Sequence, residues 1–471
     1  MRPLRLAVPL ALVCFFASHT AAQEWTRFRG PNGSGVSSST GLPVEFGAEK
    51  NVAWKTELPS GRSSPVFTED ALYLTGSDDE KLYVFCLNPA DGTRRWTREL
   101  DRARREEIYG ANDSASPTPV TDGENVYVFF PELGLLAFDG KGEERWRMPL
   151  GPFVSFYGMA ASPVIVDDTL ILLCDQQHGS YLLAVDIATG EQRWRTERTG
   201  MIEGWTTPAL FPADKPDTIV VLGSFFLCGY ALDTGEEKWR KPGMGYAPAC
   251  SPIVDGDRIF ASVQRHAEQP MPSFDSVLAD KDADGDGVVT QAEAEGHWMI
   301  EHWGWVDANR DDRIDAEEWS FINAGMTNRD YGLFAIDISE GEAGATTTVG
   351  WRYKRSLPEV ASPLLYDGVI YLVKSGGILT SVDALSGEAI KSERIRSGGS
   401  EYHGSPVAAD GKLYIPSNVG EISVVSLGGE WELLGVNDLG EPIESSPAVD
   451  RDSLYVRTES ALYCFRNSTE D

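Results

Sequence analysis

Short runs of apolar and β-branched residues recur along the chain at a nearly constant interval. Each unit begins with Ser-Pro or Thr-Pro and an apolar pair, and a β-rich run such as Val126-Tyr127-Val128 begins seven residues after most of these prolines. Turn signals separate the runs, and Asp-Gly pairs such as Asp122-Gly123 favour tight hairpins. The spacing is about 44 residues, apart from 54 residues between the first and second units and 111 residues between the fifth and sixth units. The eight prolines are Pro65, Pro119, Pro163, Pro208, Pro252, Pro363, Pro406 and Pro447.

A third apolar run in each unit usually ends on Asp, and a glycine turn and a tryptophan follow it. Leu183-Ala184-Val185-Asp186 is such a run, with Gly190 and Trp194 after it. Four short strands in about 44 residues are typical of one propeller blade. The pattern therefore predicts an all-β fold, an eight-bladed β-propeller of four-stranded blades. Three other units keep the same step from Gly to Trp: Gly92 to Trp96, Gly142 to Trp146 and Gly235 to Trp239.

The eighth unit lacks an outer strand, because the chain ends soon after Tyr463-Cys464-Phe465. The segment Asn51-Val52-Ala53-Trp54-Lys55 precedes the first unit and carries the tryptophan of an outer strand. We expect this segment to complete blade eight and close the ring, which removes open sheet edges. The propeller is thus assigned to residues 51–267 and 329–466, with an N-terminal arm at 23–50 and a tail at 467–471.

The repeat resembles that of the pyrroloquinoline-quinone-like propeller family, which includes quinoprotein dehydrogenases and the outer-membrane assembly factor B group. Ala184 to Trp194 matches the family consensus best, and the opening Trp25 to Gly33 is similar to the start of exported members. The resemblance covers residues 51–466 apart from one insertion, and it implies the same fold. If the chain were one of the dehydrogenases of this family, the resemblance would also imply a quinone bound beside two adjacent cysteines joined by a disulfide. The chain has no adjacent cysteine pair, so pyrroloquinoline quinone (PQQ) is not expected as a cofactor.

The repeat explains two of the cysteines as packing residues, with no reactive or metal-binding role. Cys86 and Cys464 stand where other units carry alanine in the third strand. Because a free cysteine behaves as a small hydrophobic residue, we expect both to be packed in the interior. The alanines at this place are Ala137, Ala184, Ala231 and Ala335.

The long fifth interval contains an insertion, residues 268–328, between the second and third strands of blade five. Its sequence Asp282-Ala283-Asp284-Gly285-Asp286-Gly287, continuing to Glu293, matches an EF-hand calcium loop at every fixed position. Calcium takes six to eight oxygen ligands in such loops. The expected ligands are the side chains of Asp282, Asp284 and Asp286, the Val288 carbonyl, Thr290 through a water, and Glu293 as a bidentate carboxylate.

A second, similar loop starts at Asp307, so the insertion resembles an EF-hand pair. Asp312 replaces the glycine of the sharp turn, and we expect it to adopt the left-handed conformation at some cost. Val289 and Ile314 are expected to meet in a short β contact, and one helix from Gln291 to Val306 to join the loops. A dockerin-like module, which shares such loops, is the nearest alternative. The expected ligands are Asp307, Asn309, Asp311, the Arg313 carbonyl, Asp315 and Glu318.

Charge and the N-terminal segment narrow the choice of location and partner. With 41 Lys and Arg against 72 Asp and Glu, the net charge of −31 argues against a nucleic-acid partner. Arg2 and Arg5 precede the apolar run Leu6 to Ala17, and Thr20-Ala21-Ala22 offers small residues for cleavage. We therefore expect residues 1–22 to be a signal peptide cleaved after Ala22, with export to the periplasm or the exterior. A membrane anchor is the alternative, although the run is short for a bilayer and no later stretch could span one.

The blade-to-blade loops and the second-to-third strand loops share one face of a propeller. Polar and aromatic residues that converge there form the default ligand site, and ordinary loop polarity is the alternative. We expect a non-catalytic exported scaffold that binds calcium, with a protein or polysaccharide on this face; the alternative is a quinone-dependent alcohol or sugar dehydrogenase. Neither a Ser/His/Asp arrangement nor zinc spacing supports a hydrolase. The candidate ligand residues are Arg62, Asp113, Asp175, Trp205, Tyr246, Glu359, His403 and Glu444.

Overall fold

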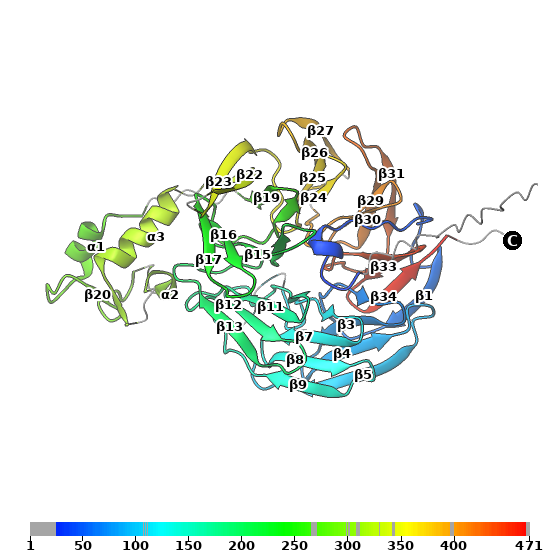
Figure 1. Ribbon diagram of the computed structural model, residues 1–471, viewed down its shortest axis with the longest axis horizontal. Coiled ribbons are helices and arrows are strands. Elements are labelled where there is room, and N and C mark those ends of the chain that lie inside the picture. The colour runs from blue at the N-terminus through cyan, green and yellow to red at the C-terminus, as the bar shows by residue number, and fades with distance from the viewer. Residues whose placement is uncertain are drawn as a thin grey trace, which may run out of the picture.

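Eight four-stranded antiparallel sheets surround a central channel (Figure 1). The computed structural model describes residues 25–467 apart from positions 107, 109, 111, 265–270, 298, 300–301, 308–310, 329, 342–343 and 396–399. Each sheet runs outward from a short inner strand beside the channel to an outer strand on the rim. The predicted eight-bladed, all-β propeller is confirmed.

The blades follow one another in chain order, each made of four strands from the inside outward. Blade one consists of β2 (Val66–Phe67), β3 (Leu72–Ser77), β4 (Lys81–Leu87) and β5 (Arg94–Asp101), and blade two of β6 (Val120–Thr121), β7 (Asn125–Phe130), β8 (Gly134–Asp139) and β9 (Glu144–Met148). Blade three consists of β10 (Val164–Val166), β11 (Thr169–Cys174), β12 (Tyr181–Asp186) and β13 (Gln192–Glu197), and blade four of β14 (Ala209–Phe211), β15 (Thr218–Leu222), β16 (Phe226–Ala231) and β17 (Glu237–Pro242). Blade five consists of β18 (Ile253–Asp255), β19 (Arg258–Val263), β22 (Gly332–Gly341) and β23 (Gly344–Tyr353), and blade six of β24 (Leu364–Tyr366), β25 (Val369–Lys374), β26 (Ile378–Asp383) and β27 (Ala389–Arg394). Blade seven consists of β28 (Val407–Ala409), β29 (Lys412–Pro416), β30 (Glu421–Ser426) and β31 (Leu433–Asp438), and blade eight of β32 (Ala448–Asp450), β33 (Ser453–Arg457), β34 (Ala461–Phe465) and β1 (Val52–Glu57).

Blade eight is completed by the first strand of the chain. β1 pairs antiparallel with β34, and Trp54 lies opposite Cys464. The expected closure of the ring is confirmed. The middle strands are largely apolar because neighbouring blades cover both of their faces. Every residue of β11 is buried, whereas the outer strand β13 is mostly exposed.

Tryptophans of five outer strands each join their blade to the next one. Trp146 of blade two donates a hydrogen bond from Nε1 to the Ile187 carbonyl of blade three at 2.8 Å. Its ring covers Gly190, which has φ +74°, and a Cβ there would lie 2.6 Å from the ring. Glycine at this turn is therefore required both by the backbone conformation and by the tryptophan of the preceding blade. Trp54, Trp96, Trp194 and Trp351 cover Gly92, Gly142, Gly235 and Gly387 in the same way.

A small residue in the third strand lies opposite each of these tryptophans. Cys86 lies opposite Trp96 and is fully buried, as is Cys464. In blade four the small residue is Gly229, which pairs with Trp239, so the assignment of Ala231 to this place was wrong. The turns after β16 and β12 have the same length, since Gly235 donates to the Ala231 carbonyl as Gly190 does to that of Asp186. Ala231 therefore takes the place of Asp186, and Asp233 lies two residues further along, within the turn.

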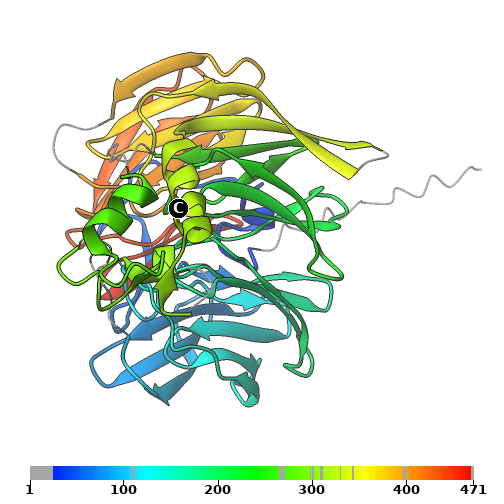
Figure 2. The ribbon, with the colours of Figure 1, turned by 90° about the vertical axis from the view of Figure 1, so that its left-hand side faces the viewer.

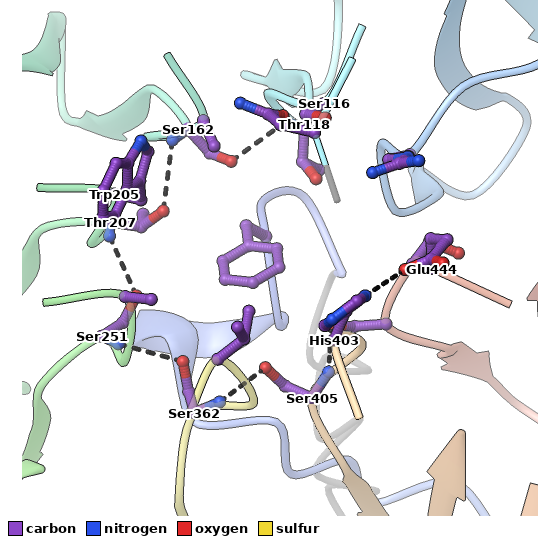
Figure 3. Close-up of a pocket in the computed structure, with 18 of the residues that line it drawn as sticks. Ser116, Thr118, Ser162, Trp205, Thr207, Ser251, Ser362, His403, Ser405 and Glu444 are labelled. Carbon is purple, nitrogen blue, oxygen red and sulfur yellow. Dashed lines mark hydrogen bonds and ion pairs between the residues drawn. The ribbon is translucent and has the colours of Figure 1, made fainter. Parts of the chain in front are cut away.

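The Ser/Thr-Pro residues form a closed hydrogen-bonded ring around the channel, which we call the hydroxyl ring. Figure 3 shows the part of it from Thr118 to Ser405. In each blade the N–H of the Ser or Thr donates to the hydroxyl of the equivalent residue in the next blade, at 2.8–3.2 Å. The last of these bonds joins Ser446 of blade eight to Ser64 of blade one at 3.1 Å. The repeated Ser/Thr-Pro dipeptide thus ties the inner strands together. The ring consists of Ser64, Thr118, Ser162, Thr207, Ser251, Ser362, Ser405 and Ser446.

Replacing Thr207 with valine should destabilise the propeller by about 1–3 kcal/mol, because the buried N–H of Ser162 loses its acceptor. The shape of the side chain is retained, so a lower urea midpoint would report the lost hydrogen bond. Thr234→Val is the control, since Thr234 lies in an exposed turn and its loss should change stability by less than about 0.5 kcal/mol. Equal midpoints for the two variants would contradict a structural role for the ring.

The N-terminal arm fills one end of the channel. The carbonyls of Trp25 and Thr26 accept hydrogen bonds from inner-strand residues of blades one and two. The guanidinium groups of Arg27 and Arg29 reach the carbonyls of Pro208 and Pro363 at 2.8 and 2.7 Å. Burial lowers the pKa of each guanidinium to about 10. The arm, which includes the short helix η1 (Pro31–Gly33), therefore holds blades on opposite sides of the ring together (Figure 1).

The insertion lies between β19 and β22 of blade five and projects from one side of the ring (Figures 1 and 2). It contains α1 (Phe274–Lys281), β20 (Val289–Thr290), α2 (Trp303–Val306), β21 (Arg313–Ile314) and α3 (Ala316–Asn328). Among the described residues, none of the helices has the length and apolar character needed to cross a membrane.

Candidate functional site

The first acidic loop follows α1 and runs from Asp282 to Glu293. Carboxylate oxygens of Asp282, Asp284 and Glu293 all lie within 4.8 Å of one another. Glu293 accepts hydrogen bonds from the N–H and hydroxyl of Thr290 at 2.9 and 2.8 Å, and from the N–H of Ala283 at 2.9 Å. These bonds, with those from Thr290 first, hold the pKa of Glu293 below its usual value. Three carboxylates facing one point can hold a hard cation.

The backbone of this loop turns sharply at two glycines. Gly287 has φ +86° and Gly285 has φ +76°, and both donate their N–H to the carboxylate of Asp282, at 3.0 and 2.7 Å. Asp286 accepts a hydrogen bond from the N–H of Val288 at 3.1 Å and lies 3.4 Å from the guanidinium of Arg313. Asp286 is therefore placed beside the group of three carboxylates but is not part of it.

The second acidic loop follows α2 and ends in α3. Carboxylate oxygens of Asp307, Asp311 and Glu318 lie within 4.8 Å of one another. Asp307 is 3% exposed and accepts a hydrogen bond from Nε1 of Trp303 at 3.1 Å. Asp312 has φ +62°, so the expected left-handed turn is confirmed.

The remaining expected ligands of the second loop differ in position. Asp315 accepts the N–H groups of Glu317 and Glu318, both at 2.9 Å, immediately before α3, and it is not one of the three converging carboxylates. The side chain of Arg313 points to Asp286 of the first loop. Asn309 lies outside the described residues.

A short antiparallel pair joins the two loops. Val289 lies opposite Ile314, and both are fully buried, which confirms the expected β contact. The expected single helix from Gln291 to Val306 was wrong, because residues 291–296 form turns and α2 begins only at Trp303. Gly296 has φ +74°, which is incompatible with continuing a helix.

The helices of the insertion pack against the propeller through apolar contacts. Gly200 packs directly against the ring of Phe321 in α3, where a Cβ would lie 2.2 Å from the ring. Gly325 in α3 packs against Phe225 in the same way, and a Cβ there would lie 2.9 Å from that ring. Trp305 of α2 contacts Tyr246 with ring centroids 6.1 Å apart. The helices on either side of the second loop, α2 and α3, therefore pack against loops of blades three to five.

A cavity of about 450 Å³ occupies the channel above the N-terminal arm, and we call it the central cavity (Figure 3). All eight residues of the hydroxyl ring line it, and Phe28 of the arm contributes to its lining. Trp205 is held at the wall by a hydrogen bond from Nε1 to the Gly158 carbonyl at 2.7 Å, and Tyr157 meets it edge-on at 5.4 Å. Charged and amide groups complete the wall: Arg62, Asn112, Gln264, Glu359, Glu401, His403 and Glu444.

His403 lies between two carboxylates of the central cavity. Its Nδ1 is 2.5 Å from Glu444 and its Nε2 is 3.4 Å from Glu401. Neither ring nitrogen is therefore directed at a serine hydroxyl of the ring, as a nucleophile and base pair would require.

Sequence comparison places this geometry in a family. A profile of the family described as outer membrane protein assembly factor BamB matches residues 36–210 and 230–471. The chain belongs to the BamB family. A search of curated proteins found no match.

Solved structures with the same architecture include other propellers of this kind. BamB from Moraxella catarrhalis is 13% identical with a TM-score of 0.55, over 88% of this chain and 99% of that one. A europium-containing methanol dehydrogenase is 10% identical with a TM-score of 0.59, over 94% and 98% of the two chains. Quinohemoprotein alcohol dehydrogenase from Comamonas testosteroni is 14% identical with a TM-score of 0.58, over 95% and 81%. At these identities the likeness extends to the fold alone.

In this BamB-family propeller, five of the eight candidate ligand residues line the central cavity: Arg62, Trp205, Glu359, His403 and Glu444. The other three have structural partners. Asp175 forms a buried ion pair with Arg198, Tyr246 packs on the insertion, and Asp113 accepts the N–H of Ala115 at 2.8 Å.

Sequence reasoning missed some of the lining. Glu401 could have been found, since it stands two residues before His403 in the same blade-to-blade loop. Phe28 belongs to the arm, which carries no repeat register, so no signal in the sequence placed it in the channel.

Proposed function

We propose that this BamB-family chain is an exported, non-catalytic propeller scaffold that binds calcium through an EF-hand pair and binds a protein or polysaccharide at the central cavity. The observation that carries the calcium proposal is the convergence of three carboxylates in each of two adjoining loops, Asp282, Asp284 and Glu293 in one and Asp307, Asp311 and Glu318 in the other. Calcium is the hard cation that such loops bind outside the cytoplasm.

Charge supports the same proposal. Residues 275–318 contain 14 Asp and Glu against 3 Lys and Arg, a net charge of −11. These carboxylates repel one another unless a cation neutralises them, so calcium binding is coupled to the folding of the insertion. Residues 1–22, which lie outside the described part of the chain, are proposed to be removed on export; the mass of the mature protein, with Gln23 at its N-terminus, tests this.

Chelation should open the insertion and spare the ring. In the presence of EDTA, limited proteolysis is expected to cut within residues 275–325, whereas the blades resist because the hydroxyl ring and the tryptophan contacts hold them together. Adding calcium back should restore protection. Calorimetry without calcium uptake, or unfolding of the whole propeller by EDTA, would contradict the proposal.

The fit of a quinone cofactor to the central cavity can be judged from its lining. PQQ carries three carboxylates. The wall of the cavity already contains three carboxylates, those of Glu359, Glu401 and Glu444, and Arg62 is the arginine in its lining. Repulsion between these groups makes the lining a poor match for PQQ. The five described cysteines are all buried and unpaired, so they offer no disulfide ring beside a cofactor. We therefore propose no quinone chemistry.

A further inference from the structure

The hydroxyl ring has unused donors. Each of its eight hydroxyls accepts an N–H from the preceding blade, but among the hydrogen bonds of the described residues none has one of these hydroxyls as donor. All eight residues line the central cavity. Eight hydroxyl protons are thus available to water or to a ligand in the cavity.

The wall above the ring offers both acceptors and a further donor. Carboxylates of Glu359, Glu401 and Glu444 line it as acceptors. Nη1 of Arg62 is buried, and no described group accepts a hydrogen bond from it. A buried donor of this kind costs free energy unless a ligand or water satisfies it.

One side of the wall is a fixed aromatic surface. The hydrogen bond to Gly158 and the edge contact with Tyr157 hold the indole of Trp205 in one orientation. Tyr157 is 45% exposed at the mouth of the cavity, and the neighbouring Phe156 is 48% exposed. A ligand in the cavity therefore meets the aromatic rings of Tyr157 and Trp205 as well as the hydroxyls.

We infer that the central cavity binds the end of a neutral oligosaccharide. Sugar hydroxyls both donate and accept, so they match a floor of hydroxyl donors and a wall of carboxylate acceptors, while the C–H face of a sugar ring packs on an aromatic ring. An anionic ligand would face three glutamates, and a cationic one would leave the hydroxyl donors and Arg62 without acceptors. The volume of about 450 Å³ is in the range of small-ligand sites. This inference rests on the proposed function, because it names the ligand class of the same cavity.

The test is calorimetry of the mature chain in calcium with six probes: the hexasaccharides of β-1,4-glucose, N-acetylglucosamine, mannose and xylose, together with hexagalacturonate and hexalysine. At least one neutral hexasaccharide should bind, and hexagalacturonate and hexalysine should not. Trp205→Ala should weaken the binding about tenfold or more, and Trp205→Phe should restore part of it. Arg62→Met, which keeps a long side chain but removes the donors, should also weaken it. The control Leu385→Ala, at a residue 79% exposed and outside the lining of the cavity, should leave the affinity unchanged.

Two results would overturn the inference: no binding of any neutral hexasaccharide, or binding of hexalysine that is lost in Glu359→Gln and retained in Trp205→Ala. Calcium titration of the same samples separates this failure from that of the proposed function. Calcium uptake without sugar binding removes the ligand assignment alone. Sugar binding accompanied by dye reduction supports the assignment and overturns the non-catalytic scaffold.

Discussion

Replacing Asp175 with alanine is expected to destabilise the propeller by about 3–5 kcal/mol, because it leaves the guanidinium of Arg198 buried without a counter-charge. Asp175 follows β11, and its carboxylate binds Nε and Nη2 of Arg198 at 2.7 and 2.9 Å. Both side chains are 0% exposed. Arg198 also donates to the hydroxyl of Tyr230 at 2.5 Å, so the pair joins blade three to blade four. Urea unfolding of the purified variant measures the loss.

A matched control is available in the same blade. Asp168 pairs with Arg193 on the surface, where its side chain is 71% exposed, so Asp168→Ala should change the unfolding midpoint little. The double variant Asp175→Leu with Arg198→Met should regain much of the stability, since it removes both buried charges. If Asp175→Ala is no less stable than Asp168→Ala, the buried pair does not support the fold.

Replacing Glu293 with glutamine is expected to weaken the first calcium site at least about 10–100-fold, since the loss of even a residue that supports a metal ligand costs that much. Glu293 is one of the three carboxylates that converge in the first loop. Calorimetry should then show one calcium site fewer than in the unmodified chain, whose sites are expected to have dissociation constants of the order of 10⁻⁴ to 10⁻³ M, as in extracellular modules. The unaltered second loop should still bind.

Glu295→Gln is the matched control, because it removes the same charge from an exposed residue of the same segment. It should leave both sites intact. In the unmodified chain we expect the first loop to bind more tightly than the second, since Asp312 holds φ +62° with a side chain whereas Gly287 holds φ +86° without one. Equal losses in Glu293→Gln and Glu295→Gln would mean that total charge, not ligation, decides the affinity.

Local patterns predicted the propeller well because each blade repeats the same contacts. The spacing from glycine to tryptophan reflects a ring that covers the glycine of the next blade, as Trp146 covers Gly190. The prediction failed in blade four, where the aspartate of the pattern, Asp233, lies two residues later in the turn, so that Gly229 and not Ala231 lies opposite Trp239. The helix predicted from Gln291 to Val306 between the two acidic loops was wrong, because Gly296 has a positive φ that ends any helix there.

Some of the candidate ligand residues line the central cavity and others have structural partners, and their positions in the loops do not predict which. Asp175 and Glu359 both follow strands and both suggested a polar face, yet Asp175 is neutralised by Arg198 whereas Glu359 lines the central cavity. The partner of Asp175 immediately follows β13, two strands further along the blade, and a sequence does not specify which charges meet.

By itself, the sequence determined the eight blades, the closure by Trp54 and the two acidic loops, because these depend on short-range spacing between residue types. The tertiary structure decided that the Ser/Thr-Pro residues form one hydrogen-bonded ring, that the arm places Phe28 in the channel, and that α3 packs on blades three and four. Those features join residues far apart in the chain. Local spacing predicts each blade, but it does not specify which residues of different blades and of the arm come into contact once the eight sheets pack around an axis.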